Sequence, residues 1–529
     1  QVEFVVFHGV HSGTKIRFFL RKIILSAHQN KAFTLYLWGT KIKIMSQEIR
    51  NLAPQPLWNK FADLNAVPRP SKKEERVIAF MKDFGTNLGL ETFEDEIRNV
   101  IIRKPATAGM ENRKPIVLQG HLDMVHQKNN DTTFDFLTQG IDMYVDGDWV
   151  RAKGATLGAD NGLGVAAIMA ILESTDIAHP AIEALFTIDE ETGMTGAKEL
   201  DGTLLNGKIL LNLDTEDDDE LSIGCAGGID TNTSYTYQET AIHEGWHVLK
   251  IKIRGLLGGH SGMDIDKGRG NANKWMARLL WELKQNTPIQ LISFDGGSLR
   301  NAIPREATCR IAVSNEEEAK EILLRTKGNL KQEYGRIEPE HQIEIESVVS
   351  SGDAMDDTDC TKILNTMCAV HNGVFRMSPE IADLVEASSS LARVIIHEGQ
   401  FTTQSLQRSS VESTKSEVSM AIRTAFENMG ATVEQSGDYP GWEPNRNSSI
   451  LQLMESLYVQ LFNETPQVKA CHAGLECGIL GKHLPGVEMI SFGPNIRAAH
   501  SPDEKVQISS VQKFWSYLLE TLKHIPQNA

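Results

Sequence analysis

The chain has 529 residues, of which 41% are hydrophobic and 23% are charged, and its net charge is −17. This length exceeds what one ordinary core supports, so we expect two domains of a globular protein. The acidic balance argues against nucleic acid as a partner, because phosphate binding requires a basic face. No apolar stretch approaches the ~20 residues of a membrane-spanning helix, so we expect no membrane partner either.

Residues 1–44 differ from the rest of the chain. They carry seven basic side chains against the single acid Glu3, and Met45 opens the stretch MSQEIRNLAPQPLWNKF. A secretory leader requires an unbroken apolar segment, whereas two charges interrupt FFLRKIIL. We expect 1–44 to be an extension that is non-native or disordered, with an arginine-rich transit peptide as the alternative.

The cysteine pattern indicates a reducing compartment. The six cysteines form no CxxC pair and are too few for a disulfide framework in a chain of this length. We therefore expect reduced thiols and a cytoplasmic protein.

Between residues 55 and 230, helical and strand patterns alternate, which predicts an α/β domain. Apolar spacing predicts helices at 56–64, 72–85 and 161–173. Short apolar runs, typical of strands covered on both faces, lie at 99–104, 115–120, 181–189 and 208–214.

After residue 230 the pattern changes to α+β. Strands with period-two alternation are predicted at 234–238 and 246–255, followed by further strands and amphipathic helices. This pattern is typical of a two-layer sandwich, present once or as two units in tandem. The later elements are a helix at 271–285, strands at 289–294 and 307–313, and a helix at 316–335.

The α/β pattern returns at 448–462, 487–492 and 509–525. The α+β domain is therefore expected to be inserted into the first domain. We expect the first part of the α/β domain at 45–228, the inserted domain, which we call the lid, at 229–424 and the second part at 425–529.

Side chains of the types that commonly bind metal ions lie next to five of these segments. His121, Glu191, Asp214 and His500 each follow a predicted strand within a few residues, and Asp160 precedes a predicted helix. Ligands of open α/β sheets bind beyond the carboxyl ends of strands, so these residues predict a metal centre. Taken singly, Asp160 could be a helix N-cap and His500 an ordinary surface histidine.

Two of these segments carry a second functional group. In HLD, His121 and Asp123 face the same side of an extended chain, so Asp123 can orient the imidazole, although a solvated turn is the alternative. The adjacent Glu190 and Glu191 point in different directions after their strand, so one can bind metal while the other acts on substrate. A solvated acidic turn is the alternative.

The five candidate ligands form two three-ligand sites if Asp160 bridges them. Imidazole and carboxylate without thiolate favour two zinc ions, with cobalt or manganese as alternatives. Two such cations activate a water and polarise a scissile carbonyl, which leaves Glu190 as the general base.

The inserted domain offers a second set of polar residues. His260 lies in the glycine-rich GGHSG, which predicts an exposed loop from which it could stabilise an oxyanion. Arg408 could hold a substrate carboxylate with two hydrogen bonds, and a structural ion pair is the equal alternative. Asn301, in GGSLRNAIPREA, belongs to the same set.

From about Met45 to the C-terminus, the chain resembles the di-zinc aminoacylase and carboxypeptidase G-like peptidases. Within them it looks like the branch that hydrolyses Xaa-His dipeptides. The likeness is carried by GHLDMV, LGADNGLG, GCAGGID, GGHSG, GNANK, YPGW, HAGLECG and HSPDE. His126 stands where proline is frequent, and residues 1–44 have no counterpart.

The resemblance implies roles for individual residues. The metal ligands would be His121, Asp160, Glu191, Asp214 and His500, with Glu190 as base and Asp123 as orienting residue. His260, Asn301 and Arg408 would handle the substrate carbonyl and carboxylate, and His472, Gly474 and Glu476 would line the pocket. A homodimer through the lid is also implied.

The function expected from sequence is hydrolysis of dipeptides with a C-terminal histidine, including β-alanyl-histidine (carnosine). A broader di/tripeptidase or an N-acyl amino acid amidohydrolase is the nearest alternative. A metal-binding protein without catalysis is less favoured, because binding alone requires neither Glu190 nor Asp123. An assembly role through the lid surface is a third alternative.

Overall fold

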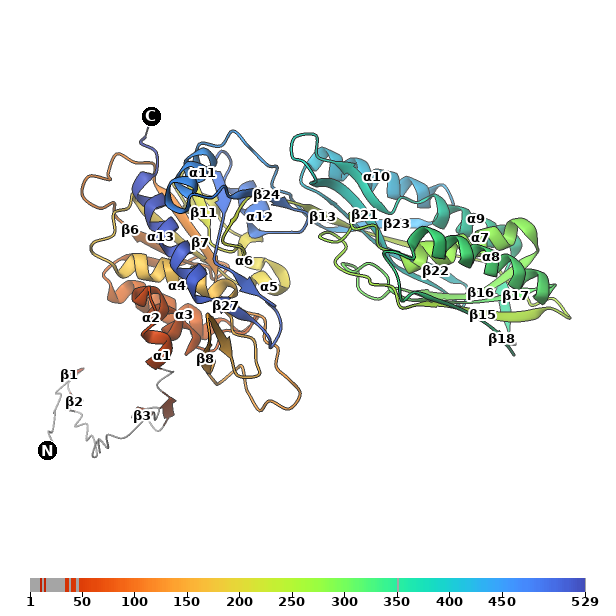
Figure 1. Cartoon of the computed structure of the whole chain (residues 1–529), viewed down its shortest axis with the longest axis horizontal. Coiled ribbons are helices and arrows are strands. Elements are labelled where there is room, and N and C mark those ends of the chain that lie inside the picture. Colours follow the sequence, from red (N-terminus) through yellow and green to blue (C-terminus); the bar gives the residue numbers. More distant parts are fainter. Residues whose placement is uncertain are drawn as a thin grey trace.

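The computed structural model describes residues 47–349 and 352–528, together with four short strands ahead of residue 47. These strands pair as β1 (Val10–His11) with β2 (Thr14–Lys15) and β3 (Thr34–Leu37) with β4 (Thr40–Lys43). The rest of the expected extension at 1–44 lies outside the described residues. Figure 1 shows two domains joined by a narrow connection.

The first domain is built on a mixed eight-stranded sheet. Strand β7 runs parallel to β10 and β11, and β11 runs parallel to β25, whereas β6 and β5 are antiparallel at one edge. The α/β architecture predicted for this domain is confirmed, and its sheet is mixed. In spatial order the strands are β24 (Gln467–Cys471), β12 (Glu220–Cys225), β25 (Glu488–Ser491), β11 (Ile209–Asn212), β7 (Ile116–His121), β10 (Ile182–Thr187), β6 (Val100–Lys104) and β5 (Glu91–Glu94).

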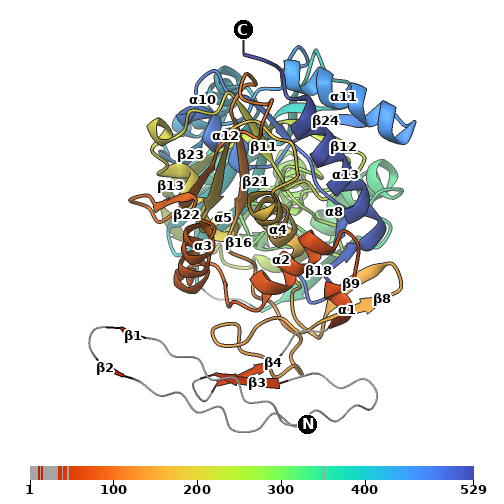
Figure 2. The ribbon, with the colours of Figure 1, turned by 90° about the vertical axis from the view of Figure 1, so that its left-hand side faces the viewer.

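Helices cover both faces of this sheet, and Figure 2 shows several of them around it. They include the helices predicted at 56–64, 72–85 and 161–173. The helices are α1 (Gln47–Arg50), α2 (Gln55–Asn65), α3 (Glu75–Asn87), α4 (Ala159–Glu173), α5 (Glu190–Gly193), α6 (Thr195–Lys198), α11 (Ser449–Phe462), α12 (Glu476–His483) and α13 (Ile508–His524), with a 3-10 turn at Gly202–Leu204.

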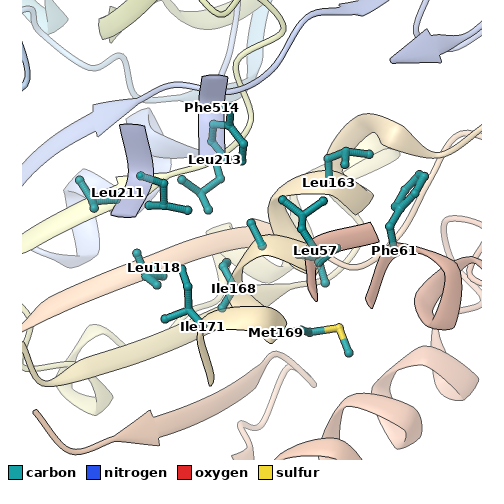
Figure 3. Packing of buried hydrophobic residues seen from close by; sticks show 14 of the residues in the cluster. Leu57, Phe61, Leu118, Leu163, Ile168, Met169, Ile171, Leu211, Leu213 and Phe514 are labelled. Atoms are coloured by element: carbon teal, nitrogen blue, oxygen red, sulfur yellow. The ribbon is translucent and has the colours of Figure 1, made fainter. Parts of the chain in front are cut away.

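Each face of the sheet has its own core, because successive strand residues point to opposite faces. In β7, Leu118 belongs to the larger core and its neighbour Val117 to the smaller one. Figure 3 shows Leu118, Leu211 and Phe514 in the larger core. Buried side chains of α2, α4, α11 and α13 belong to this core. Nearly every side chain of α4 is buried, as expected for a helix that is apolar all round.

A small four-stranded sheet lies beside the main one. It consists of β26 (Ile496–Arg497), β27 (Lys505–Gln507), β9 (Trp149–Ala152) and β8 (Met143–Asp146). Because β27 pairs with β9, this sheet joins chain from before the inserted domain to chain from after it.

The inserted domain has one nine-stranded antiparallel sheet, with its helices on one face (Figure 1). The expected two-layer architecture is therefore present, with a single continuous sheet. Its strands are β18 (Gln342–Val348), β15 (His247–Arg254), β17 (Ala307–Val313), β16 (Ile289–Gly296), β21 (Val385–His397), β22 (Gln400–Ser409), β13 (Gly227–Thr236), β23 (Thr432–Tyr439) and β20 (Gly373–Met377). The helices are α7 (Ala272–Asn286), α8 (Glu316–Tyr334), α9 (Asp357–Ala369) and α10 (Glu412–Glu427), and β14 (Glu239–Ala241) pairs with β19 (Asp353–Met355).

The chain passes between the domains twice, and the two passages lie side by side. Cys225 and Trp442 exchange backbone hydrogen bonds of 3.0 and 2.9 Å. A Cβ on Gly227 would lie 2.4 Å from the backbone of Tyr439, so this close approach requires glycine. The expected boundary at residue 424 is corrected, because it falls inside α10 and the lid sheet continues to the end of β23.

Within the described part of the chain, no helix is both long and apolar enough to cross a membrane.

The burial of Leu118 gives a stability prediction. Leu118→Ala removes a fully buried side chain from β7, and we expect the free energy of unfolding to fall by about 2–5 kcal/mol. Thermal and urea unfolding measure this loss. The control is Leu324→Ala on α8, where the side chain is 56% exposed and little change is expected. Equal effects of the two substitutions would contradict the packing described here.

Candidate metal centre

The candidate ligands meet at the end of the first domain's sheet where its parallel strands have their carboxyl ends. His121 is the last residue of β7, Glu190 and Glu191 follow β10, and Asp214 follows β11. Because these strands are parallel neighbours, their carboxyl ends lie at the same edge. The topology thus brings together side chains that are far apart in the sequence.

Asp160 lies between two histidines at the start of α4. One of its carboxylate oxygens is 3.1 Å from His121 Nε2, and the other is 3.1 Å from His500 Nε2. A carboxylate that presents one oxygen to each side has the geometry required of a bridging ligand. The hydrogen bonds with both histidines hold the pKa of Asp160 below its usual value although burial opposes this.

The donor atoms form two groups that share Asp160. His121, Asp160 and Asp214 make one group, and Asp160, Glu191 and His500 make the other. In each group the ligand atoms lie within 4.8 Å of one another. One oxygen of Glu191 is buried without a hydrogen-bond partner. These oxygen and imidazole donors fit divalent cations such as zinc.

His500 lies after the inserted domain in the sequence, whereas the other four candidate ligands lie before it. It follows β26, and its Nε2 lies 2.9 Å from Glu191. Hydrogen bonds with Asp160 and Glu191 raise the pKa of His500 to about 11. A histidine that attracts a proton this strongly marks a region of negative potential, which also attracts metal cations.

The same potential acts on His121. Burial disfavours its charged form, but Asp214, Asp123 and Asp160 outweigh this and raise the pKa of His121 well above its ordinary value.

Asp123 lies behind His121 and is fully buried. Its carboxylate accepts the backbone N–H groups of Glu190 at 3.0 Å and Glu191 at 3.3 Å, and His121 Nδ1 lies 3.4 Å away. Asp123 is therefore placed to orient the imidazole, as expected, and also to fix the turn that carries both glutamates.

Glu190 also lies among the ligands. It forms a third group with His121 and Glu191, so distance alone does not separate a base from a ligand. Burial raises the pKa of Glu190 well above its usual value, and Glu476, Glu191 and Asp160 add to the effect.

A second polar cluster lies where the lid meets the first domain. Arg408 donates to the Tyr439 hydroxyl at 2.8 Å and lies 3.4 Å from His260 Nε2, and Ser388 bonds His472 at 2.7 Å. Burial and the nearby guanidinium lower the pKa of His260 to about 4 and that of His472 to about 3. Both imidazoles are thus neutral near pH 7.

Arg408 has no ion-pair partner among the described residues, and its Nε is buried without a hydrogen bond. The structural ion pair considered from the sequence is therefore not formed. A buried guanidinium without a carboxylate partner is costly unless a bound anion provides one.

Three other expected pocket residues occupy different positions. Asn301 is exposed, and its backbone binds Ser261 next to His260. A Cβ on Gly474 would contact Tyr439 and Met194. Glu476 is 1% exposed and accepts hydrogen bonds from Gln119 at 2.6 Å and Thr187 at 2.8 Å, so it lies beneath the ligands rather than on an open wall.

The sequence reasoning missed three residues of this region. Tyr439 holds Arg408, while Arg69 and Glu504 are buried beside the ligand segments. The motifs YPGW and HSPDE pointed to Tyr439 and Glu504 without indicating their contacts. Nothing in the sequence around Arg69 signals its burial.

Comparison with known proteins gives the family. The model of "Peptidase family M20/M25/M40" matches residues 117–524. The cytosol non-specific dipeptidase of Escherichia coli K12 is 42% identical over 481 residues, which are 90% of this chain and 99% of that protein. The crystal structure of aminoacylhistidine dipeptidase from Vibrio alginolyticus superposes with a TM-score of 0.87 at 43% identity, over 91% of this chain and 99% of that one.

A more distant structure, aminopeptidase PepT from Bacillus cereus, shares the fold with a TM-score of 0.52 at 16% identity, over 90% of this chain and 99% of that one. The chain belongs to peptidase family M20/M25/M40 and is a peptide hydrolase. The family and fold class expected from the sequence are thereby confirmed.

The shared position of Asp160 gives a prediction about metal binding. We expect the wild-type chain to hold two divalent ions and Asp160→Asn at most one, because an amide has only one oxygen ligand. Elemental analysis after dialysis against Zn²⁺ measures the number. Asp219→Asn is the control, since Asp219 bonds Gln467 at 2.6 Å outside both groups. An unchanged number in Asp160→Asn would contradict the bridging geometry.

Proposed function

We propose that this protein is a metal-dependent dipeptidase that hydrolyses unblocked dipeptides, among them Xaa-His dipeptides such as β-alanyl-histidine. The observation that carries the proposal is the pair of ligand groups that share Asp160, with Glu190 beside them. The names of the two relatives that are 42% and 43% identical support a dipeptide substrate. Those names differ in breadth, so histidine need not be the only acceptable C-terminal residue.

The proposed cofactor is a pair of zinc ions, with cobalt or manganese as substitutes. His121, Asp160 and Asp214 would hold one ion, and Asp160, Glu191 and His500 the other. When bound, such ions act as Lewis acids that polarise the scissile carbonyl and lower the pKa of the attacking water.

Glu190 is the proposed general base. Its carboxylate takes a proton from the water as the water oxygen bonds to the carbonyl carbon. The same carboxyl later gives that proton to the amine nitrogen as the C–N bond breaks. Asp123 supports this role by binding the Glu190 N–H at 3.0 Å, which fixes the start of the turn.

Arg408 supports recognition of the free C-terminus. Arg408 is 5% exposed and forms no ion pair among the described residues, so a substrate carboxylate would complete its pairing. His260 lies beside it at 3.4 Å and could donate to the carbonyl oxygen. Recognition of the free C-terminal carboxylate would favour short peptides over internal cleavage.

The alternatives are a broader di/tripeptidase and an N-acyl amino acid amidohydrolase. Both use the same metal centre and the same carboxylate contact, and they differ in what occupies the N-terminal side. Cytoplasmic location is also proposed, supported by the name of the E. coli relative and by the free cysteines. The homodimer through the lid stays a prediction.

A substrate panel tests the proposal. We expect turnover of β-alanyl-histidine and other free dipeptides, weak turnover of N-acetylated or C-amidated analogues, and loss of activity after chelation with recovery on adding Zn²⁺. Activity that resists chelation would exclude the metal mechanism. A preference for the N-acetylated compounds would favour the amidohydrolase.

Substitution of the base is a separate test. Glu190→Gln should keep the bound metal but lose about 10²–10⁴-fold in kcat, the usual contribution of a general base. Elemental analysis and initial rates measure the two quantities. Glu199→Gln, at an exposed position in the same segment, is the control. A kcat near wild type, or loss of metal from Glu190→Gln, would remove Glu190 from this role.

A further inference from the structure

Two buried charged residues hold the loop that leads to Asp160. Glu504 is 2% exposed and Arg69 is 1% exposed, and neither belongs to a ligand group. Both bind the backbone of residues 157–160, which ends at the bridging carboxylate.

Glu504 accepts four backbone N–H groups from this loop. One of its oxygens binds Leu157 at 2.7 Å and Gly158 at 2.9 Å, and the other binds Ala159 at 2.7 Å and Asp160 at 3.3 Å. The N–H groups of Ala159 and Asp160 have no partner inside α4, because the first N–H groups of a helix lack one, and Leu157 and Gly158 precede the helix. Glu504 lies four residues after His500. The same segment therefore supplies a candidate metal ligand and the acceptor that holds the loop.

Arg69 binds the same loop through a carbonyl. Its guanidinium donates to Gly158 at 2.6 Å, to the Leu122 carbonyl at 3.2 Å and to the Asp123 carbonyl at 2.9 Å. Leu122 and Asp123 directly follow His121. Arg69 therefore connects the His121 strand end with the Asp160 loop.

Gly158 is the point where both contacts meet. Its N–H binds Glu504 and its carbonyl binds Arg69, and its φ of 68° is one that residues with a side chain rarely adopt. A Cβ there would lie 2.6 Å from the Arg69 guanidinium, so the loop fits against Arg69 only with glycine at this position.

We propose that Arg69 and Glu504 are a pair of positioning residues that set the spacing of the ligands. Arg69 fixes the Asp160 loop to the strand end of His121, and Glu504 fixes it to the segment of His500. The three segments come from distant parts of the sequence, and His500 follows the inserted domain. The pair thus determines how accurately Asp160 can face both histidines. The inference rests on the proposed metal centre.

Cobalt binding tests the pair without relying on turnover. Metal-free full-length protein is titrated with Co²⁺, and the visible absorption reports both affinity and ligand geometry. We expect Glu504→Gln to weaken Co²⁺ binding about 10–100-fold and to change the spectrum, as residues that orient ligands do. Arg69→Lys, which keeps the charge but loses the forked donor, should have the same kind of effect.

The double variant tests whether the two residues act together. Because both hold one loop, Arg69→Lys/Glu504→Gln should lose little more affinity than the weaker-binding single variant. Residues that act independently would give losses that multiply, which would overturn the proposed pairing.

Glu183→Gln is the matched control. Glu183 is also a buried carboxylate that accepts two backbone N–H groups, from Asn206 at 2.7 Å and Gly207 at 2.9 Å. It lies in β10 at the end away from Glu190. Thermal unfolding of the metal-free proteins measures stability, and Glu183→Gln should lose stability but keep wild-type Co²⁺ binding.

The outcomes separate the inference from the proposed function. Wild-type affinity and spectrum in both Glu504→Gln and Arg69→Lys would overturn the inference, and so would an equal loss in Glu183→Gln. If one variant does not fold, the other decides. Wild-type protein that binds no Co²⁺ would overturn the metal centre itself, and the inference with it.

Discussion

The candidate site depends on the collection of acidic groups at the carboxyl ends of the parallel strands β7, β10 and β11. Asp160, Glu190 and Asp214 lie close to one another with little access to water. Burial raises the pKa of Glu190 and Asp214 well above the ordinary values, because several carboxylates cannot ionise together cheaply away from solvent. Bound metal cations would offset the repulsion between these carboxylates. The ionised form of the site is therefore most stable when metal is bound. The acidic groups come together because the carboxyl ends of neighbouring parallel strands lie at the same end of the sheet.

The layer beneath the ligands is polar for a related reason. Gln119 lies two residues before His121, and Asn212 lies two residues before Asp214, so each points to the same side as the ligand that follows it. The Asn212 amide donates to Gln119 at 2.5 Å, and Gln119 donates to Glu476 at 2.6 Å. This buried network ties β7 to β11 and to α12 directly below the metal centre. Apolar side chains there would pack equally well but would not fix the relative positions of the strand ends.

Much of the fold and of the ligand set could be predicted because the signals are local. An apolar strand followed by a histidine or carboxylate is visible in the sequence, and so is the apolar α4. The end of the lid was misplaced because β23 reads TVEQSGDY, which lacks the apolar alternation of a half-buried strand and has several exposed positions. Arg69 could not be predicted at all. Its burial depends on backbone carbonyls of two distant loops, and contacts to backbone leave no pattern in side-chain types.

Arg408 and the acidic metal ligands belong to different domains. The ligands lie in the first domain, Arg408 and the neutral His260 lie in the lid, and the neutral His472 comes from the first domain. A free dipeptide has the complementary pattern, with an ammonium at one end and a carboxylate at the other. Blocking either end removes one half of this match. Tyr439 connects Arg408 to the passage between the domains, because its hydroxyl bonds Arg408 at 2.8 Å while its backbone lies against Gly227 at that passage. Movement of the lid would therefore move Arg408 relative to the metal ligands, and the fit of the proposed dipeptide substrate would depend on its length.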